Sequence, residues 1–219
     1  LKSKYLIIIL AVIIIKINFS INVKAEEYNR FNNISIEDGL SQATVETMMQ
    51  DSKGYIWLGT NDGLDRYNGY TFKKYSYEKG QENSLVNSYI LDIKEDSEGN
   101  IWVATAAGIS KIYNDGEKVQ NYTSDSESGN LSNDNTTTML ISNSNKIYVG
   151  TAEGINLYDK KTDKFNLIYP ELKEEYVNSL AEDKYGNIWA GTENGLYKIN
   201  VVTNAIERFE STDDVNTIS

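Results

Sequence analysis

Cysteine and histidine are absent from this chain of 219 residues, and proline occurs once, at Pro170. Without cysteine no disulfide can form, and without cysteine or histidine no zinc site of the Cys or Cys/His type can be assembled. The same absences exclude a Ser-His-Asp or Cys-His nucleophile and a phosphoacceptor histidine. Carboxylate pairs and Ser/Lys chemistry remain open. We expect no cofactor and no bound metal.

Positive charge is also scarce. The chain has 21 Lys and Arg against 32 Asp and Glu, a formal net charge of -11. An acidic surface repels nucleic acid and anionic lipid, so we expect no nucleic-acid partner. Acidity also keeps an exported protein soluble, and we prefer this simpler interpretation of the charge.

The first 25 residues have the pattern of a targeting segment. Lys2 and Lys4 precede the apolar run Leu6–Ile15, and a polar stretch then ends in Val23-Lys24-Ala25, a small-residue cleavage pattern. As a helix this apolar run is about 15 Å long, against a hydrocarbon core of about 30 Å. We predict a cleaved signal peptide over residues 1–25 and an extracytoplasmic location. An uncleaved membrane anchor is the alternative.

One short phrase recurs four times with an aromatic residue in the same slot. The phrases are D-S-K-G-Y-I-W-L-G-T-N-D-G-L, D-S-E-G-N-I-W-V-A-T-A-A-G-I, S-N-S-N-K-I-Y-V-G-T-A-E-G-I and D-K-Y-G-N-I-W-A-G-T-E-N-G-L. The slot residues Trp57, Trp102, Tyr148 and Trp189 follow at intervals of 45, 46 and 41 residues. A period in this range indicates an array of one supersecondary unit.

Each repeat is predicted to hold four short strands. In the last repeat these are Val177–Glu182, Ile188–Thr192, Leu196–Asn200 and Ala205–Glu210. A turn with Asp and Gly follows the first strand, and an Asn-Gly hairpin follows the second. In the other repeats the first strands are Val45–Gln50, Ile90–Glu95 and Thr136–Ile141, and the outer strands are Thr71–Tyr75, Lys118–Tyr122 and Lys164–Ile168.

The second strand of each repeat is apolar without alternation, as in Ile56, Trp57 and Leu58. Such a strand is buried on both faces, and a four-stranded sheet covered on both faces by its neighbours is a propeller blade. We predict an all-β chain of four-stranded antiparallel blades, about four in number, as an open or partial propeller after the signal segment. The predicted boundaries are a lead-in strand over 26–40 and blade repeats over 41–85, 86–133, 134–175 and 176–219.

The aromatic slot residues are assigned to the core rather than to ligand stacking. The small residue two positions later leaves room for a side chain of the neighbouring blade, which we expect to be aromatic. The next threonine should bond the backbone of the adjacent hairpin. The structural residues of the repeat are Trp57, Trp102, Tyr148, Trp189, Gly59, Gly150 and Gly191, with Ala104 in the second repeat.

The phrase D-x-x-G-x-I-W-x-G-T-x-x-G-L resembles the two-component regulator propeller repeat. The segments Phe31–Ser41 and Gly63–Phe72 resemble the lead-in and the G-L-x-R-Y-x-G-x-x-F motif of that family. The resemblance implies the extracytoplasmic sensor region of a bacterial receptor. Such propellers usually have seven blades, followed by an immunoglobulin-like domain, a membrane helix and a histidine kinase, hybrid or diguanylate cyclase output.

The end of the chain departs from that pattern. Asn216-Thr217-Ile218-Ser219 resembles Asn83-Ser84-Leu85-Val86, which leads into the second repeat. We therefore expect the chain to stop as a fifth repeat begins and to be a fragment of a longer receptor. Its partners would then include the missing downstream domains and a second receptor copy in a homodimer.

A ligand site is predicted where the loops before the first strands meet the hairpins after the second strands. The repeats agree poorly there, as a surface shaped by a ligand would, although ordinary loop drift gives the same variation. Asn, Asp and Glu could hydrogen-bond a small molecule or an oligosaccharide. The candidate ligand residues are Asn61, Asp62, Asn87, Asn133, Glu153, Glu174, Glu193 and Asn194.

The favoured function is a non-catalytic, ligand-sensing module of a transmembrane signalling receptor. The first alternative is a secreted or surface propeller that acts as a protein-binding scaffold or adhesin. A propeller lyase or glycan-active enzyme is a weaker alternative, because such an enzyme usually needs histidine or a pocket with paired carboxylates.

Overall fold

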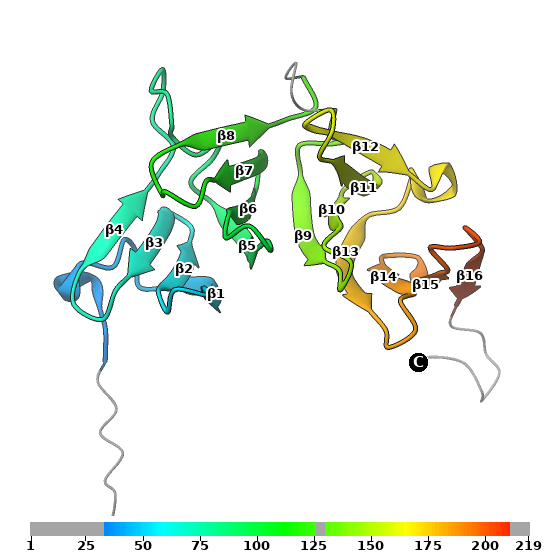
Figure 1. Ribbon diagram of the computed structural model, residues 1–219, viewed down its shortest axis with the longest axis horizontal. Helices are drawn as coiled ribbons and strands as arrows, with labels where there is room; N and C mark the ends of the chain where they lie inside the picture. The colour runs from blue at the N-terminus through cyan, green and yellow to red at the C-terminus, as the bar shows by residue number, and fades with distance from the viewer. Residues whose placement is uncertain (1–32, 126–129, 211–219) are drawn as a thin grey trace, which may run out of the picture. The chain divides into compact units, whose positions relative to one another are not determined.

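The computed structural model describes residues 33–125 and 130–210 and contains four antiparallel sheets (Figure 1). Each sheet has four strands that pair in chain order. We name the sheets blade 1 to blade 4. The predicted all-β chain of four-stranded blades is confirmed. The predicted signal segment 1–25, the part of the lead-in before Asn33 and the start of a fifth repeat at 216–219 lie outside the described residues. The described part of the predicted lead-in strand, 33–40, holds the 3-10 helix η1 (Ile36–Asp38) and no strand.

The strands occupy equivalent places in the four blades. The first strands are β1 (Val45–Gln50), β5 (Ile90–Glu95), β9 (Thr136–Ile141) and β13 (Val177–Glu182). The second strands are β2 (Ile56–Thr60), β6 (Ile101–Thr105), β10 (Ile147–Thr151) and β14 (Ile188–Thr192). The third strands are β3 (Gly63–Tyr67), β7 (Gly108–Ile112), β11 (Gly154–Asp159) and β15 (Gly195–Ile199). The outer strands are β4 (Phe72–Tyr75), β8 (Val119–Tyr122), β12 (Lys164–Ile168) and β16 (Ile206–Phe209).

The first strands have the predicted bounds, whereas three outer strands begin one residue later than predicted. The reason is local, because the preceding residue gives its N–H to a turn side chain. Thr71 donates to Asn68 Oδ1 at 2.8 Å, and Lys118 donates to Asp115 Oδ1 at 3.3 Å. These side chains take N–H groups that the longer predicted strands would have used.

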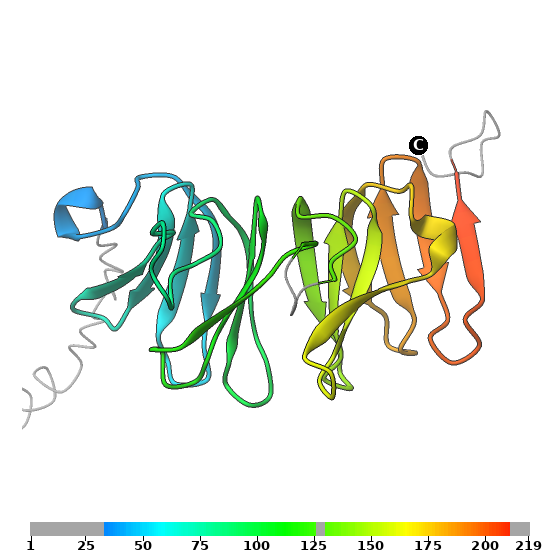
Figure 2. The same cartoon turned by 90° about the horizontal axis from the view of Figure 1, so that it is seen from above.

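Neighbouring blades contact each other along their first strands. β1 lies against β5, β5 against β9, and β9 against β13. Figure 2 shows the sheets following one another in chain order. Each first strand carries a register shift near its start, such as that between Ile90 and Asp92. The blades are therefore copies of one unit down to the position of the β-bulge.

The hydrophobic core lies in the seams, by which we mean the interfaces between neighbouring blades. One cluster joins Trp57 and Tyr75 of blade 1 to Ile112 of blade 2. Equivalent clusters join blade 2 to blade 3 and blade 3 to blade 4. All five residues of β6, of β7 and of β10 are buried, as expected for strands covered on both faces.

The aromatic slot residues lie in these seams. Trp57 and Tyr148 are each 2% exposed and Trp102 is fully buried, whereas Trp189 in blade 4 is partly exposed. In three blades the indole packs against the last aromatic residue of the outer strand, tilted in blade 1 and stacked in blades 2 and 4. The ring centroids are 5.5 Å apart for Trp57–Tyr75, 5.7 Å for Trp102–Tyr122 and 5.6 Å for Trp189–Phe209.

An aspartate at the first turn holds the indole in place. In blade 2 the Nε1 of Trp102 donates to Asp96 Oδ2 at 2.8 Å, and Asp96 Oδ1 accepts from the backbone N–H of Glu98 and Asn100. The same pairing recurs as Trp57 with Asp51 and Trp189 with Asp183. In blade 3 both members change together, to Tyr148 and Ser142.

The first-turn glycine is replaced by Asn145 in blade 3, and this residue has φ 57°. Asparagine tolerates this left-handed conformation better than most residues other than glycine. The predicted threonine bonds are also confirmed. Thr105 Oγ1 donates to the carbonyl of Gly108 at 2.8 Å, and the threonines of the other blades make the equivalent bond.

The prediction of an aromatic neighbour opposite the small residues is wrong. A Cβ on Gly59 would lie 2.6 Å from Ile90 Cγ2, and a Cβ on Gly150 would lie 2.8 Å from Val177 Cγ1. From the next blade, the side chain that packs against each of these two glycines is thus the β-branched residue at the start of the first strand. These branched side chains already fill the space beside the glycine, which leaves no room for a ring.

Candidate functional site

The loops before the first strands and the hairpins after the second strands lie together, as the predicted site requires. In blades 2, 3 and 4 the first N–H of the hairpin donates to the loop before the first strand, as in Ala106 N to Tyr89 O at 3.1 Å. In blade 1 the N–H of Asn61 donates to Gln42 Oε1 at 3.2 Å. Loop and hairpin are therefore hydrogen-bonded to each other in every blade. This end of the blades forms the candidate site, and we call it the loop face.

Two of the predicted ligand residues, Asn133 and Glu153, form a hydrogen bond with each other. Asn133 Nδ2 donates to Glu153 Oε1 at 3.0 Å, which joins a loop to a hairpin within blade 3. Asn133 Oδ1 also accepts from the N–H of Asn135 at 2.8 Å. The partly exposed carboxylate of Glu153 is thus oriented by the protein and keeps acceptor capacity for a ligand.

The remaining candidates lie separately along the same face. Asn61, Asp62, Glu174 and Glu193 are exposed. Asn87 is partly buried and uses its Oδ1 to accept from the N–H of Tyr89 at 2.8 Å, which is a turn bond. The structure brings no other pair of the eight predicted residues into hydrogen-bond contact within the ranges it describes.

The sequence reasoning missed Glu175, which is the most connected side chain of this face. Its carboxylate accepts from Tyr197 at 2.7 Å, Thr192 at 2.9 Å and Asn194 at 3.1 Å. Burial alone would raise the pKa of Glu175, but these hydrogen bonds outweigh burial and hold the pKa below its ordinary value. Glu175 is therefore a carboxylate fixed in one orientation.

A signal for Glu175 was present in the third strands. The third residue of each is polar or hydroxylated and follows an apolar residue, and each bonds the loop before the first strand of its own blade. Asp65 accepts from the N–H and hydroxyl of Ser41, both at 2.8 Å. The others bond Val86, Ser132 and Glu175 from Ser110, Asn156 and Tyr197 respectively.

The chemistry of this face is that of hydrogen bonding. It offers carboxylate and amide groups at the loop ends, and the chain has no histidine or cysteine to add a nucleophile or a soft metal ligand. Within the described residues no group of three or more acidic side chains is placed to hold a metal ion. The arrangement can bind a polar molecule.

The fold and the repeated turn define a protein built of propeller blades. Three of its repeats also match a known family of repeats. The sequence model described as the two component regulator propeller matches residues 39–62, 84–107 and 171–194. Each match runs from a loop through the first two strands to the hairpin, in blades 1, 2 and 4. Three of the four blades are therefore similar to the two component regulator propeller repeat.

A curated relative matches over a short stretch. The histidine kinase P4 of Formosa agariphila is 44% identical over 57 residues. These make up 26% of this chain and 4% of that protein, so the chain spans only a small part of the relative.

Solved structures with the same fold include receptors and enzymes. The extracellular domain described as that of the hybrid two component system BT3049 from B. thetaiotaomicron has a TM-score of 0.62 at 21% identity, over 80% of this chain and 31% of that one. A streptogramin B lyase has a TM-score of 0.64 at 15% identity, over 87% and 61%. The virginiamycin B lyase from Staphylococcus aureus has 0.59 at 16% identity, over 80% and 58%. At these identities the likeness shows the propeller fold.

Proposed function

We propose that this chain is the ligand-sensing part of a bacterial transmembrane signalling receptor, located outside the cytoplasm and without catalytic activity of its own. The observation that carries the proposal is the match of three blades to the two component regulator propeller. The likeness to extracellular domains of two component systems supports the same assignment. Within the described residues no helix is long and apolar enough to cross a membrane.

The lack of histidine supports a binding role over the lyase role of two neighbours. The Staphylococcus aureus lyase is described as catalytically inactive when one histidine is replaced by alanine. This chain has no histidine with which to perform that step. Its loop face instead presents oriented carboxylates such as Glu153 and Glu175, which suit the hydroxyl groups of a neutral sugar.

The receptor part of the proposal is tested by sequencing the gene beyond the Ser219 codon. We expect further blades, then a membrane helix and a kinase or cyclase domain. A stop codon after the last blade, with no membrane helix, would overturn the receptor assignment.

The binding part is tested by calorimetry on the purified chain with neutral disaccharides, namely cellobiose, maltose and xylobiose. We expect Glu153→Gln to weaken binding by about tenfold, since a charge-assisted bond to a sugar hydroxyl becomes a neutral one. Glu98→Gln is the matched control, because Glu98 lies at the first turn of blade 2, at the opposite end of the strands. Equal affinities of the two variants would contradict a site on the loop face, as would the absence of binding by all three sugars.

A further inference from the structure

The three seams use the same four positions to fill their outer part. One blade supplies two of them, namely the slot residue and the last residue of the outer strand. The next blade supplies the other two, namely the last apolar residue of its third strand and the outer-strand residue that pairs with it. Seam 1/2 holds Trp57, Tyr75, Ile112 and Val119; seam 2/3 holds Trp102, Tyr122, Tyr158 and Phe165; seam 3/4 holds Tyr148, Ile168, Ile199 and Ile206.

Seam 3/4 is underfilled relative to the others. It has one aromatic ring at these positions, whereas seam 1/2 has two and seam 2/3 has four. The stacked pair of slot residue and outer-strand ring is replaced by Tyr148 and Ile168. Smaller side chains leave space here, because neighbouring blades contact each other along equivalent first strands in every seam.

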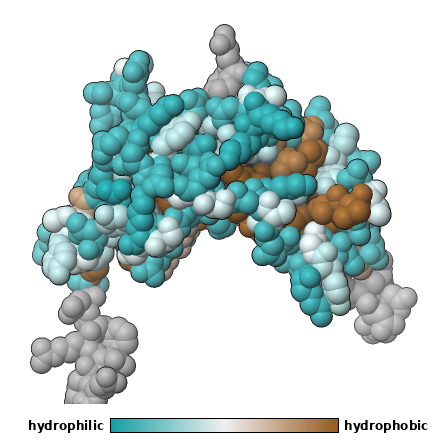
Figure 3. Space-filling model, viewed as in Figure 1, coloured by the Kyte–Doolittle hydropathy of each residue, from teal (hydrophilic) through white to brown (hydrophobic). Residues whose placement is uncertain are grey.

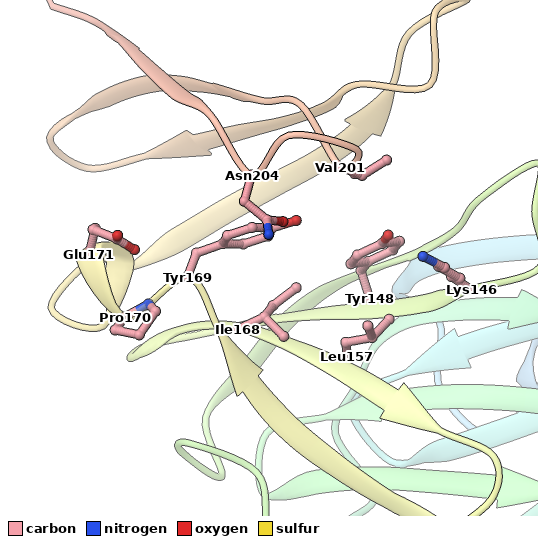
Figure 4. Close-up of a pocket in the computed structure, with 9 residues that line it drawn as sticks. All are labelled: Lys146, Tyr148, Leu157, Ile168, Tyr169, Pro170, Glu171, Val201 and Asn204. Atoms are coloured by element: carbon pink, nitrogen blue, oxygen red, sulfur yellow. The ribbon is translucent and has the colours of Figure 1, made fainter.

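A cavity of about 360 Å³ occupies this seam (Figure 4). In the view of Figure 4, Ile168 and Leu157 lie below it and Val201 lies above it, while the rings of Tyr169 and Tyr148 lie on either side. Figure 3 shows apolar surface over β12 and the turn between β15 and β16, where Val202 is 87% exposed. The cavity is therefore lined by both apolar and polar groups, the latter including Glu171 and Asn204, and is reached from an apolar surface.

Tyr169 is held at this cavity in an unfavourable backbone conformation. Its φ of 56° and ψ of 72° lie in the left-handed region, which a tyrosine seldom adopts. The strain brings its ring to the edge of the cavity, opposite Tyr148. Such outliers are concentrated at ligand clamps and active sites. Burial raises the pKa of Tyr148 to about 12, so its hydroxyl stays protonated and can donate.

An unpaired cation lies at the Tyr148 end of the cavity. Lys146 is exposed, and its ammonium group has no ion-pair or hydrogen-bond partner in the described part of the chain. In blades 2 and 4 this position is Asn100 or Asn187, whose side-chain amide donates to the turn aspartate. In blade 3 the aspartate is replaced by Ser142 and the asparagine by Lys146. This turn has therefore lost a carboxylate and gained a positive charge.

We propose that seam 3/4 is a binding site for a small planar aromatic compound with one carboxylate group. The ring would lie between Tyr148 and Tyr169, where offset and edge contacts between aromatic rings are favourable, and the carboxylate would pair with Lys146. The volume lies at the lower end of the range for small-molecule sites, about 300–1,000 Å³. Six of the nine lining residues are apolar or aromatic. The three polar ones, Lys146, Glu171 and Asn204, are too few for a sugar with several hydroxyls. Blade 3 is also the blade that the family match leaves out.

The site is tested by titration calorimetry of the purified chain with phenylacetate. Phenylacetamide, cyclohexylacetate and glucuronate serve as probes of charge, ring planarity and sugar chemistry. We expect phenylacetate to bind at least about tenfold more tightly than each of the others. Equal binding of the amide would remove the role of Lys146, and tighter binding of glucuronate would replace the aromatic ligand by a sugar acid. Either result, or no binding of phenylacetate, overturns the proposal.

Three variants connect binding to this seam. Ile168→Phe restores the ring found in the other blades and should abolish phenylacetate binding while the melting temperature stays equal or rises. Tyr169→Gly removes the ring and the backbone strain together, so we expect lost binding without lost stability.

Lys146→Asn introduces the residue of blades 2 and 4 and should weaken binding by about tenfold. Lys184→Asn, an exposed lysine of the first turn in blade 4, is the control. Unchanged affinity in Ile168→Phe and Tyr169→Gly would overturn the assignment.

Discussion

The aspartate carboxylate at the first turn has two structural roles, since it accepts hydrogen bonds both from the turn backbone and from the buried indole. Asp96 closes the first turn through two backbone N–H groups and satisfies the buried indole of Trp102. Sequence reasoning treated these residues separately, as a turn residue and a core residue. The connection was visible in the repeats, because Asp occurs where the slot is Trp and Ser occurs where it is Tyr.

Replacing Asp96 by alanine is expected to destabilise the fold by about 2–4 kcal/mol. The change leaves the Nε1 of fully buried Trp102 without a partner and removes the side-chain bonds of the turn. Urea unfolding followed by tryptophan fluorescence measures the effect. Asp62→Ala is the control, since Asp62 is exposed and accepts no hydrogen bond within the described residues. Similar unfolding midpoints for both variants would refute the structural role of Asp96.

At the scale of the strand, the sequence predicted much because local chemistry decides local structure. The bounds of β1, β5, β9 and β13 follow from turn residues and apolar runs. The identity of the neighbour across each seam did not follow, since Gly59 and Ile90 lie far apart in the sequence and meet only when blades contact. A small residue announces a close approach but does not state which side chain approaches.

The two glycines at equivalent places should respond differently to the same change. Gly59→Ala forces a Cβ to within 2.6 Å of both Ile90 Cγ2 and Thr47 Cγ2, and we expect a loss of about 1–3 kcal/mol. Gly191→Ala meets only the hydroxyl of Ser179, which can rotate away, and should cost much less.

Chemical denaturation of both variants measures this difference. In an Ile90→Ala background, Gly59→Ala should lose only part of its effect, because the clash with Ile90 Cγ2 is gone while the clash with Thr47 Cγ2 remains. Equal losses for Gly59→Ala and Gly191→Ala, or no coupling to Ile90, would show that the seam does not set the cost.

At the scale of the whole molecule, the blades share their core with their neighbours rather than each holding its own. Burial is accordingly uneven along the chain. Every residue of β6 is buried, whereas β14 in blade 4 has three partly exposed residues, among them Trp189. In repeat arrays stability depends on the contacts between adjacent units, so equivalent strands need not be equally stable.

Amide hydrogen exchange should reveal this gradient. We expect peptides that contain Ile101–Thr105 to exchange at least about tenfold more slowly than peptides that contain Ile188–Thr192, since local opening is easier where fewer apolar contacts are broken. Mass spectrometry under native conditions provides the measurement. Equal protection of the two strands would mean that the blades open together as a single unit.

The sequence by itself determined the period, the four strands of each blade, the turn chemistry and the loop face, because all of these depend on residues close to one another in the chain. It also marked the third blade as different, through Ser142, Lys146 and Tyr148. Only the tertiary structure decided what that difference means. Whether a smaller side chain leaves a cavity depends on the volume supplied by the next blade, and Ile199 and Ile206 do not fill the space. The cavity of seam 3/4 and the fixed carboxylate of Glu175 arise from contacts between segments that the sequence separates.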